Sequence, residues 1–202
     1  MRFAGLATAW VASLTPAAAK ADGSGVVLDG SIALGTSLAV ASSMYAQSPY
    51  EADPDSPGTD NFDNARSAAP YFAVDMALGG ALSSWLVAGA VARAGVAGAP
   101  SPFTGELQQR AFWLVGPKLS IVPRATGIRA ALMGGRAGHL GSGWGTAVNT
   151  SYDTMMPSGW RLGWGFEVSA LWTRDHEDGD HGRYTYDNRV VTTSLMMTMR
   201  GR

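Results

Sequence analysis

One short stretch near the C-terminus carries a dense set of metal-ligand residue types. It contains four acids and two histidines within eight residues: Asp175, His176, Glu177, Asp178, Asp180 and His181. Carboxylate oxygens and imidazole nitrogens bind divalent cations, so the stretch is a candidate cation-binding loop. Its acids lack the spacing of a dedicated calcium loop, and a solvated external turn is the alternative. We therefore assign no metal and no cofactor to it.

A histidine and a serine lie three residues apart in the chain, at His139 and Ser142. If Asp175 or Glu177 approached the imidazole, the set would have the residue types of a serine hydrolase that acts on lipid. No catalytic motif flanks the pair, and a chain with three histidines readily brings one of them near a serine. We therefore expect no enzyme and no catalytic residues, and we keep the lipid hydrolase as an alternative.

A third set of charged residues occupies alternating positions in otherwise apolar segments. Its members are Asp29, Asp75, Lys118, Arg129, Asp153, Arg161 and Glu167. Every second side chain of a strand points to the same side, so these residues share the face opposite the bulky apolar ones. Unpaired charges in a narrow interior cost several kcal/mol each, so we expect a network of ion pairs and hydrogen bonds. A gated ion or small-solute path through the same residues is the alternative.

The segments that carry these charges alternate with period two. Bulky apolar residues take mostly the even positions of residues 26–40, and small or charged residues take the odd ones. The same rule holds at 72–82 and at 160–172. Such alternation predicts strands rather than helices, and fifteen residues is long for a strand of a soluble protein. A bulky apolar face opposite a small or ionisable face is typical of a transmembrane β-barrel.

Eight segments follow this rule, and the connections between them differ in length. The predicted strands lie near residues 26–40, 70–82, 85–94, 111–122, 128–138, 144–155, 160–174 and 183–199. Tight connections at 83–84, 123–127 and 156–159 alternate with mostly longer ones at 41–69, 95–110, 139–143 and 175–182. Short periplasmic turns and longer external loops fit bacterial outer-membrane barrels. We therefore expect an all-β fold, an eight-stranded antiparallel up-and-down transmembrane barrel.

Two features weigh against this simple pattern. Residues 77–95 would also suit a marginal transmembrane helix, although Arg93 and a plausible turn at 83–84 argue against it. Pro117 removes a hydrogen-bond donor from its strand, so we expect a bulge or a register shift there.

A soluble β-sandwich also alternates, but its outer face here would be mainly Ala, Gly and Ser, which is poor cover in water.

Aromatic residues fall near the predicted strand ends, where they would form two interfacial girdles. The external set is Phe72, Trp113, Trp144, Trp172 and Tyr184, and the periplasmic set is Trp85, Tyr152 and Trp160.

The N-terminus has the pattern of an export signal. Met1 and Arg2 form a short positive region, residues 3–14 are apolar, and small residues with A-x-A spacing lie at 15–21. We expect a signal peptide over 1–21, cleaved after Ala19 or Ala21, and a barrel over 22–202.

Composition excludes several classes of protein. The 202 residues are 15% charged and include no cysteine, which removes disulfide frameworks and thiolate metal sites. A net charge of −1 gives no general basis for binding nucleic acid. The mean hydropathy of +0.02 argues against a bundle of transmembrane helices.

The chain as a whole resembles the small eight-stranded outer-membrane barrels of the OmpA/OmpX type and the uncharacterised barrel proteins of Gram-negative bacteria. The segments YFAVDMALGGALSSWLVAGAV, FWLVGPKLSIVPRATGIRAALMGG and SYDTMMPSGWRLGWGFEVSALWTR look like their hairpins. The resemblance implies an integral outer-membrane protein, non-enzymatic, that serves envelope structure, surface interaction or minor permeation.

The expected partners follow from the expected location in the outer membrane and from the loops. Membrane lipid and lipopolysaccharide would surround the barrel, which we expect to be a monomer. The expected loop 41–69 carries five acids against one arginine, so it is an anionic surface for an external ligand or partner.

Overall fold

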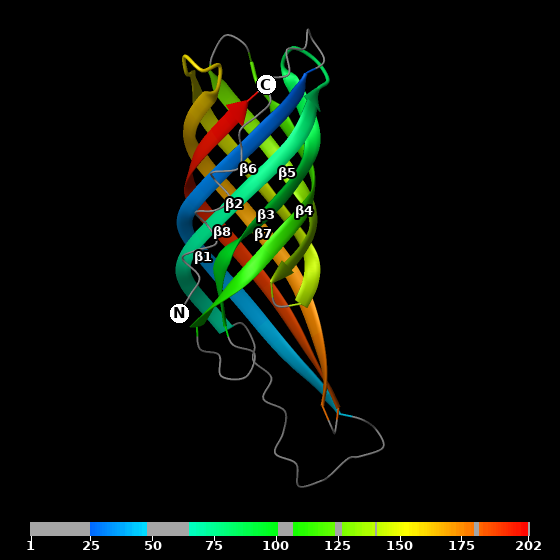
Figure 1. Ribbon diagram of the computed structural model, residues 1–202. Coiled ribbons are helices and arrows are strands. Elements are labelled where there is room, and N and C mark those ends of the chain that lie inside the picture. Colours follow the sequence, from blue (N-terminus) through cyan, green and yellow to red (C-terminus); the bar gives the residue numbers. More distant parts are fainter. Residues whose placement is uncertain are drawn as a thin grey trace.

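Eight long strands make up the described part of the chain (Figure 1). The computed structural model describes residues 25–47, 65–100, 107–123, 127–139, 141–179 and 182–201. The strands are β1 (Val26–Gln47), β2 (Ala65–Ala81), β3 (Leu86–Pro100), β4 (Leu107–Ile121), β5 (Ile128–His139), β6 (Gly141–Met155), β7 (Arg161–Gly179) and β8 (Gly182–Gly201). No helix with the length and apolar character of a membrane span occurs in these residues.

The strands form a closed antiparallel barrel. Each strand pairs with the next one in the chain, and β8 pairs with β1. Paired residues followed once around the barrel lead from Val40 back to Gly30 on β1, a stagger of ten residues. Such a stagger requires strands tilted against the barrel axis, as Figure 1 shows. The predicted all-β, eight-stranded antiparallel barrel is confirmed, and the helix considered for 77–95 is instead the hairpin of β2 and β3.

Several strands are longer than the apolar pattern indicates. β1 continues to Gln47, and β7 continues to Gly179, where it pairs with the start of β8 at Gly182. These ends project beyond the rest of the barrel in the lower part of Figure 1. The predicted loops at 41–69 and 175–182 are therefore partly strand. Backbone pairing continues past residues 40 and 174, where the predicted strands end, so the side-chain pattern alone marks these strand ends too early.

The expected bulge or register shift at Pro117 is wrong. The pairs Val115–Arg136 and Lys118–Met133 on the two sides of the proline have the same register between β4 and β5. The pairing with β3 runs through Pro117 without an offset.

Glycines next to Pro117 explain why the register survives. A Cβ on Gly116 would lie 2.0 Å from the carbonyl oxygen of Gly134, so β4 and β5 approach there more closely than side chains allow. The Pro117 ring itself points outward and is exposed. Pro117 interrupts the pairing of β4 with β5 locally, and the residues on either side of it keep the two strands in register.

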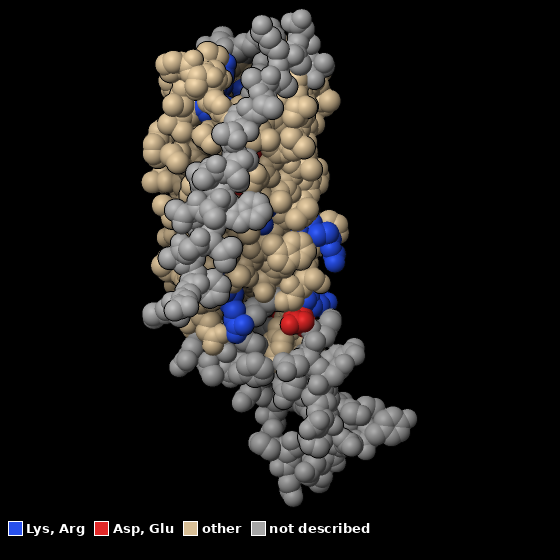
Figure 2. Space-filling model, viewed as in Figure 1, with Lys and Arg blue, Asp and Glu red and all other residues tan. Residues whose placement is uncertain are grey.

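The outer wall is apolar. Large apolar side chains on the outward positions of every strand except β3 are exposed, among them Phe166 at 68% and Trp164 at 66%. On β3 the exposed outward residues are Ala90, Ala92 and Ala94. In Figure 2 the visible wall is mostly tan, and Lys and Arg side chains gather toward its ends. Trp113, Trp144 and Trp172 are exposed toward one end of the barrel.

The other predicted girdle residues differ in placement. Trp85 and Tyr152 are exposed at the opposite end, whereas Phe72 and Trp160 are half-buried. The side chain of Tyr184 lies outside the described residues.

The barrel interior is filled by its own side chains. A buried apolar cluster occupies one half, where Tyr71 stacks on Phe112 with 5.6 Å between ring centroids. Val27, Val87 and Val122 form a smaller cluster at the other end. Charged side chains fill the interior beside these two clusters, and they form the candidate site.

Candidate functional site: an ion-pair network across the barrel interior

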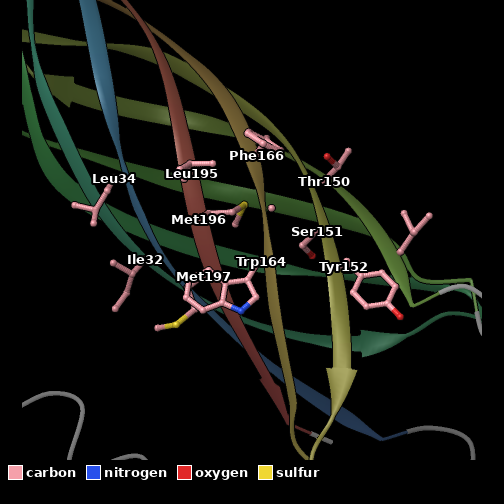
Figure 3. Close-up of a pocket in the computed structure, with 12 residues that line it drawn as sticks. Ile32, Leu34, Thr150, Ser151, Tyr152, Trp164, Phe166, Leu195, Met196 and Met197 are labelled. Atoms are coloured by element: carbon pink, nitrogen blue, oxygen red, sulfur yellow. The ribbon is translucent and has the colours of Figure 1, made fainter.

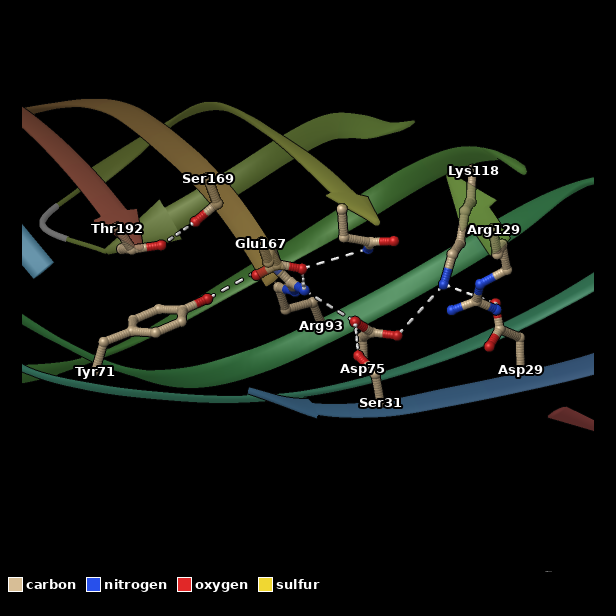
Figure 4. A network of polar contacts seen from close by, with 11 residues as sticks. Asp29, Ser31, Tyr71, Asp75, Arg93, Lys118, Arg129, Glu167, Ser169 and Thr192 are labelled. Atoms are coloured by element: carbon tan, nitrogen blue, oxygen red, sulfur yellow. Dashed lines mark hydrogen bonds and ion pairs between the residues drawn. The ribbon is translucent and has the colours of Figure 1, made fainter. Parts of the chain in front are cut away.

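Arg93 on β3 is the central residue of the buried network (Figure 4). Both of its terminal nitrogens donate to Glu167, Nη1 to Oε1 at 2.8 Å and Nη2 to Oε2. Nη2 also donates to Asp75 Oδ2 at 2.9 Å. Arg93 is 3% exposed and both carboxylates are 1% exposed. A guanidinium presents its donors in a planar fork, so one arginine joins carboxylates from β2 and β7.

Two further cations continue the network toward the start of β1. Lys118 Nζ lies 3.0 Å from Asp29 Oδ2 and 3.5 Å from Asp75 Oδ1. Arg129 Nη1 donates to the same Asp29 oxygen at 2.7 Å, and its Nε lies 4.0 Å from Asp153 Oδ2. Ion pairs therefore run from Glu167 to Asp153 without a break. We call this set the lumen network: Asp29, Asp75, Arg93, Lys118, Arg129, Asp153 and Glu167.

Hydroxyl groups satisfy several of the remaining carboxylate lone pairs. Ser31 Oγ donates to Asp75 at 2.6 Å. Ser151 and Thr198 donate to Asp153 at 2.9 and 3.2 Å. A buried charge is tolerated only when pairing and hydrogen bonds offset its lost hydration, and these groups supply part of that offset.

Strand alternation positions the lumen network. Its seven members come from seven different strands, one from each of β1 to β7, all on inward positions. They hold four carboxylates and three cations, and the 4% exposed Arg200 of β8 supplies a fourth cation nearby. Tertiary closure of the barrel thus brings opposite charges together from residues as far apart in sequence as Arg93 and Glu167.

Six of the seven residues predicted for the interior lie in the lumen network. The exception is Arg161, which is half-buried opposite Arg200 and pairs with no acid in the described part of the chain. Sequence reasoning missed Arg93 and Arg200. Charge balance could have identified Arg93, because the mid-depth residues Asp75, Lys118 and Glu167 leave one negative charge uncompensated.

One cavity that lies beside these charges is small. A cavity of about 20 Å³ lies against Asp29, Lys118 and Arg200, which is room for about one water molecule. Asp29 Oδ1 and Arg200 Nη1 are buried without a protein hydrogen-bond partner, so a water there would satisfy them. Apolar residues of both clusters lie next to these charges: Val27 and Val87 line the same cavity, and Ala77 pairs with Asp29.

The candidate cation-binding loop stays a prediction. The side chains of His176, Glu177, Asp178, Asp180 and His181 lie outside the described residues, and Asp175 is exposed. Within the described ranges no group of three or more His, Asp or Glu side chains could hold a metal ion.

The hydrolase pair is not assembled. The Asn188 amide donates to His139 Nδ1 at 2.7 Å, and His139 Nε2 lies 3.4 Å from the Ala97 carbonyl oxygen. The imidazole therefore faces the interior. Ser142 is exposed and alternates in phase with the outward Trp144, so its hydroxyl points to the other side of the wall.

The outer wall also has a large shallow groove, of about 800 Å³ (Figure 3). Ile32 and Leu34 of β1 lie along one side of it, with Trp164 and Phe166 of β7 among its other lining residues. No charged side chain lines this groove among the described residues.

Comparisons with known proteins give similarities of structure alone. The sequence matches no protein-family model, and no curated protein matches it significantly. Neisserial surface protein A is similar at 12% identity and a TM-score of 0.48, over 89% of this chain and 98% of that one. The outer membrane protein AlkL is similar at 12% identity and a TM-score of 0.42, over 86% and 90%. The outer membrane protease OmpT of Escherichia coli is similar at 10% identity and a TM-score of 0.39, over 85% and 96%.

The class of protein follows from the geometry of the chain itself. It is a closed eight-stranded antiparallel barrel with an apolar exterior and an ionic interior.

Proposed function

We propose that this protein is an integral outer-membrane β-barrel with a closed interior, a non-enzymatic protein of the Gram-negative envelope. In this role it contributes to envelope structure and presents acidic external loops to other surfaces or ligands. One observation carries the proposal: bulky apolar side chains cover the outside while charged side chains fill the inside.

The outer wall suits hydrocarbon better than water. Trp164, Phe166, Leu195 and Leu34 are each exposed by 60% or more. Apolar surface costs about 25 cal/mol per Å² in water, and monomeric soluble proteins rarely expose large contiguous apolar patches. Lipid solvates such a band at no comparable cost, and a closed barrel leaves no unpaired strand edge in the membrane.

The filled interior favours a structural role over permeation. The lumen network joins side chains of β1 to β7 across the interior, and two buried apolar clusters fill space beside it. An eight-stranded barrel is just wide enough to be filled by its side chains. Solute passage would require breaking buried ion pairs.

The geometry at His139 supports a non-catalytic role. Its imidazole is held by Asn188, and the Ser142 hydroxyl lies on the opposite face of the wall. A serine nucleophile needs a base within hydrogen-bond reach.

Two measurements on the full chain test the proposal. After membrane fractionation, we expect the protein in the outer membrane, with different gel mobility in boiled and unboiled samples because folded barrels resist detergent. A soluble protein or an unchanged mobility would contradict it.

Planar-bilayer recordings separate this proposal from a channel. We expect no discrete conductance steps from the wild type. Steps that disappear in Lys118→Met or Glu167→Gln would favour a narrow ion path. An altered lipid profile that depends on Ser142 would favour the hydrolase.

A further inference from the structure

Arg136 of β5 points outward from an otherwise apolar part of the wall. It alternates in phase with the exposed Ile128 and Leu132, and it is itself exposed. Its guanidinium carbon lies 5.4 Å from the ring centroid of Trp144, its cross-strand partner on β6. It pairs with no acid among the residues that the structure describes. An outward arginine with no counter-charge is unusual on a lipid-facing surface.

The row of cross-strand neighbours continues with aromatic and basic residues. Trp144 pairs with Trp172 of β7, and Trp172 pairs with Arg189 of β8. Strands lie about 4.8 Å apart, so two outward arginines flank two tryptophans over about 14 Å. Tryptophan prefers the membrane interface, and arginine there faces lipid headgroups.

A second groove in the outer wall is lined by Gly135, which precedes Arg136 on β5, and by Trp144, the cross-strand partner of Arg136. It has a volume of about 510 Å³, and its outward lining side chains include Pro117, Leu119, Leu132 and Trp144. The groove lies where the pairing of β4 with β5 is interrupted and where Gly134 has no side chain to fill the space. On β5 the groove residues precede Arg136, so the groove runs from the arginine toward the middle of the apolar wall.

Two comparisons within the molecule distinguish this place. The groove of about 800 Å³ has no cation in its lining. Arg174, another outward arginine near the same end of the barrel, forms a bidentate ion pair with Asp187, Nε to Oδ1 at 2.5 Å and Nη2 to Oδ2 at 2.8 Å. Arg136 differs from both: it has no acid partner among the described residues, and its neighbours Gly135 and Trp144 line an apolar groove.

We infer that Arg136 and this groove bind a phosphorylated glycolipid of the outer leaflet, of the lipid A class. The phosphate accepts hydrogen bonds from the Arg136 guanidinium, and one acyl chain occupies the groove over Gly134. The inference rests on the proposed function, because it requires the wall to face lipid and this end of the barrel to be external. Arginine is well suited to phosphate, which accepts its forked donors, and the aromatic row places the charge at headgroup depth.

Retention of lipid A by the purified full-length protein tests the inference. Native mass spectrometry of the detergent-solubilised barrel would compare bisphosphorylated lipid A with the same lipid after enzymatic removal of its phosphates. We expect the wild type to retain the phosphorylated form about tenfold more tightly.

Four variants assign the effect to the two parts of the site. Arg136→Gln should lose about tenfold in affinity for lipid A, while Arg174→Gln should not change it. Gly134→Leu fills the groove, and a Cβ there makes only ordinary contacts, the nearest at 3.4 Å. It should weaken both lipid forms about tenfold. Gly80→Leu, where a Cβ meets nothing within 4 Å, is the matched control.

Equal retention of the two lipids by the wild type would overturn the inference, and so would equal losses in Arg136→Gln and Arg174→Gln. If Gly134→Leu fails to fold, Arg136→Gln still decides the outcome. Gel mobility of unboiled samples shows whether the proposed function itself fails. A wild type without a folded, heat-modifiable form would refute the membrane-barrel proposal and this inference together.

Discussion

At the scale of single residues, Arg93 is a sensitive point of the interior. It joins carboxylates from β2 and β7 that are both almost fully buried. Its removal would leave Asp75 and Glu167 near each other without their shared cation. Leaving a buried charge unpaired costs more than an intact ion pair contributes, because desolvation is no longer offset.

Arg93→Met should lower the free energy of unfolding by about 3–5 kcal/mol. Urea titration of the protein refolded in lipid vesicles, followed by tryptophan fluorescence, would measure this change. Arg174→Met removes an exposed ion pair and should leave the midpoint nearly unchanged.

A triple variant separates lost attraction from unpaired charge. Arg93→Met combined with Asp75→Asn and Glu167→Gln removes all three charges, so it should recover part of the stability. If Arg93→Met alone shifts the midpoint no more than Arg174→Met does, the lumen network has no structural role.

At the scale of elements, the contact of β4 with β5 depends on glycine. A Cβ on Gly135 would lie 2.1 Å from the carbonyl oxygen of Val115, whereas a Cβ on the adjacent Gly134 would meet nothing closer than 3.4 Å. The difference arises because Gly135 packs directly against the β4 backbone. This pair of neighbours therefore tests how closely the two strands approach.

Gly135→Ala should destabilise the barrel by about 1–3 kcal/mol, the usual cost of overpacking. Gly134→Ala should be neutral or slightly stabilising, since alanine loses less backbone entropy than glycine. The same urea titration would rank them. Equal midpoints for the two variants would show that β4 and β5 are farther apart than described.

At the scale of the whole molecule, the proposed function requires that the apolar wall contacts lipid. Leu195→Arg places a charge in the middle of the outward band, where it should cost about 2–4 kcal/mol and reduce the folded fraction in vesicles. Ala111→Arg lies beyond Trp113 toward the end of β4, so its cost should be about 0–1 kcal/mol. A harmless Leu195→Arg would mean that water, not lipid, contacts this band.

Sequence patterning was sufficient for the strands because the two sides of the wall require different side chains. Each strand places apolar groups outside and small or polar groups inside, so period-two alternation identifies all eight segments. The period-two pattern failed to predict how far β1 and β7 extend. The extra residues of β1 and β7 are held by backbone pairing, and backbone hydrogen bonds leave little trace in the side-chain pattern.

The amino-acid sequence by itself determined the eight strands, the alternation of apolar and small or charged faces along them, and six of the seven residues that enter the lumen network. The tertiary structure alone decided which charges meet. Barrel closure and the stagger between strands set the depth of each residue, so Arg93 reaches Glu167 across the interior while Arg161 stays at the rim. The groove beside Arg136 likewise arises only where glycines of β4 and β5 come together, because its shape belongs to two strands and to neither alone.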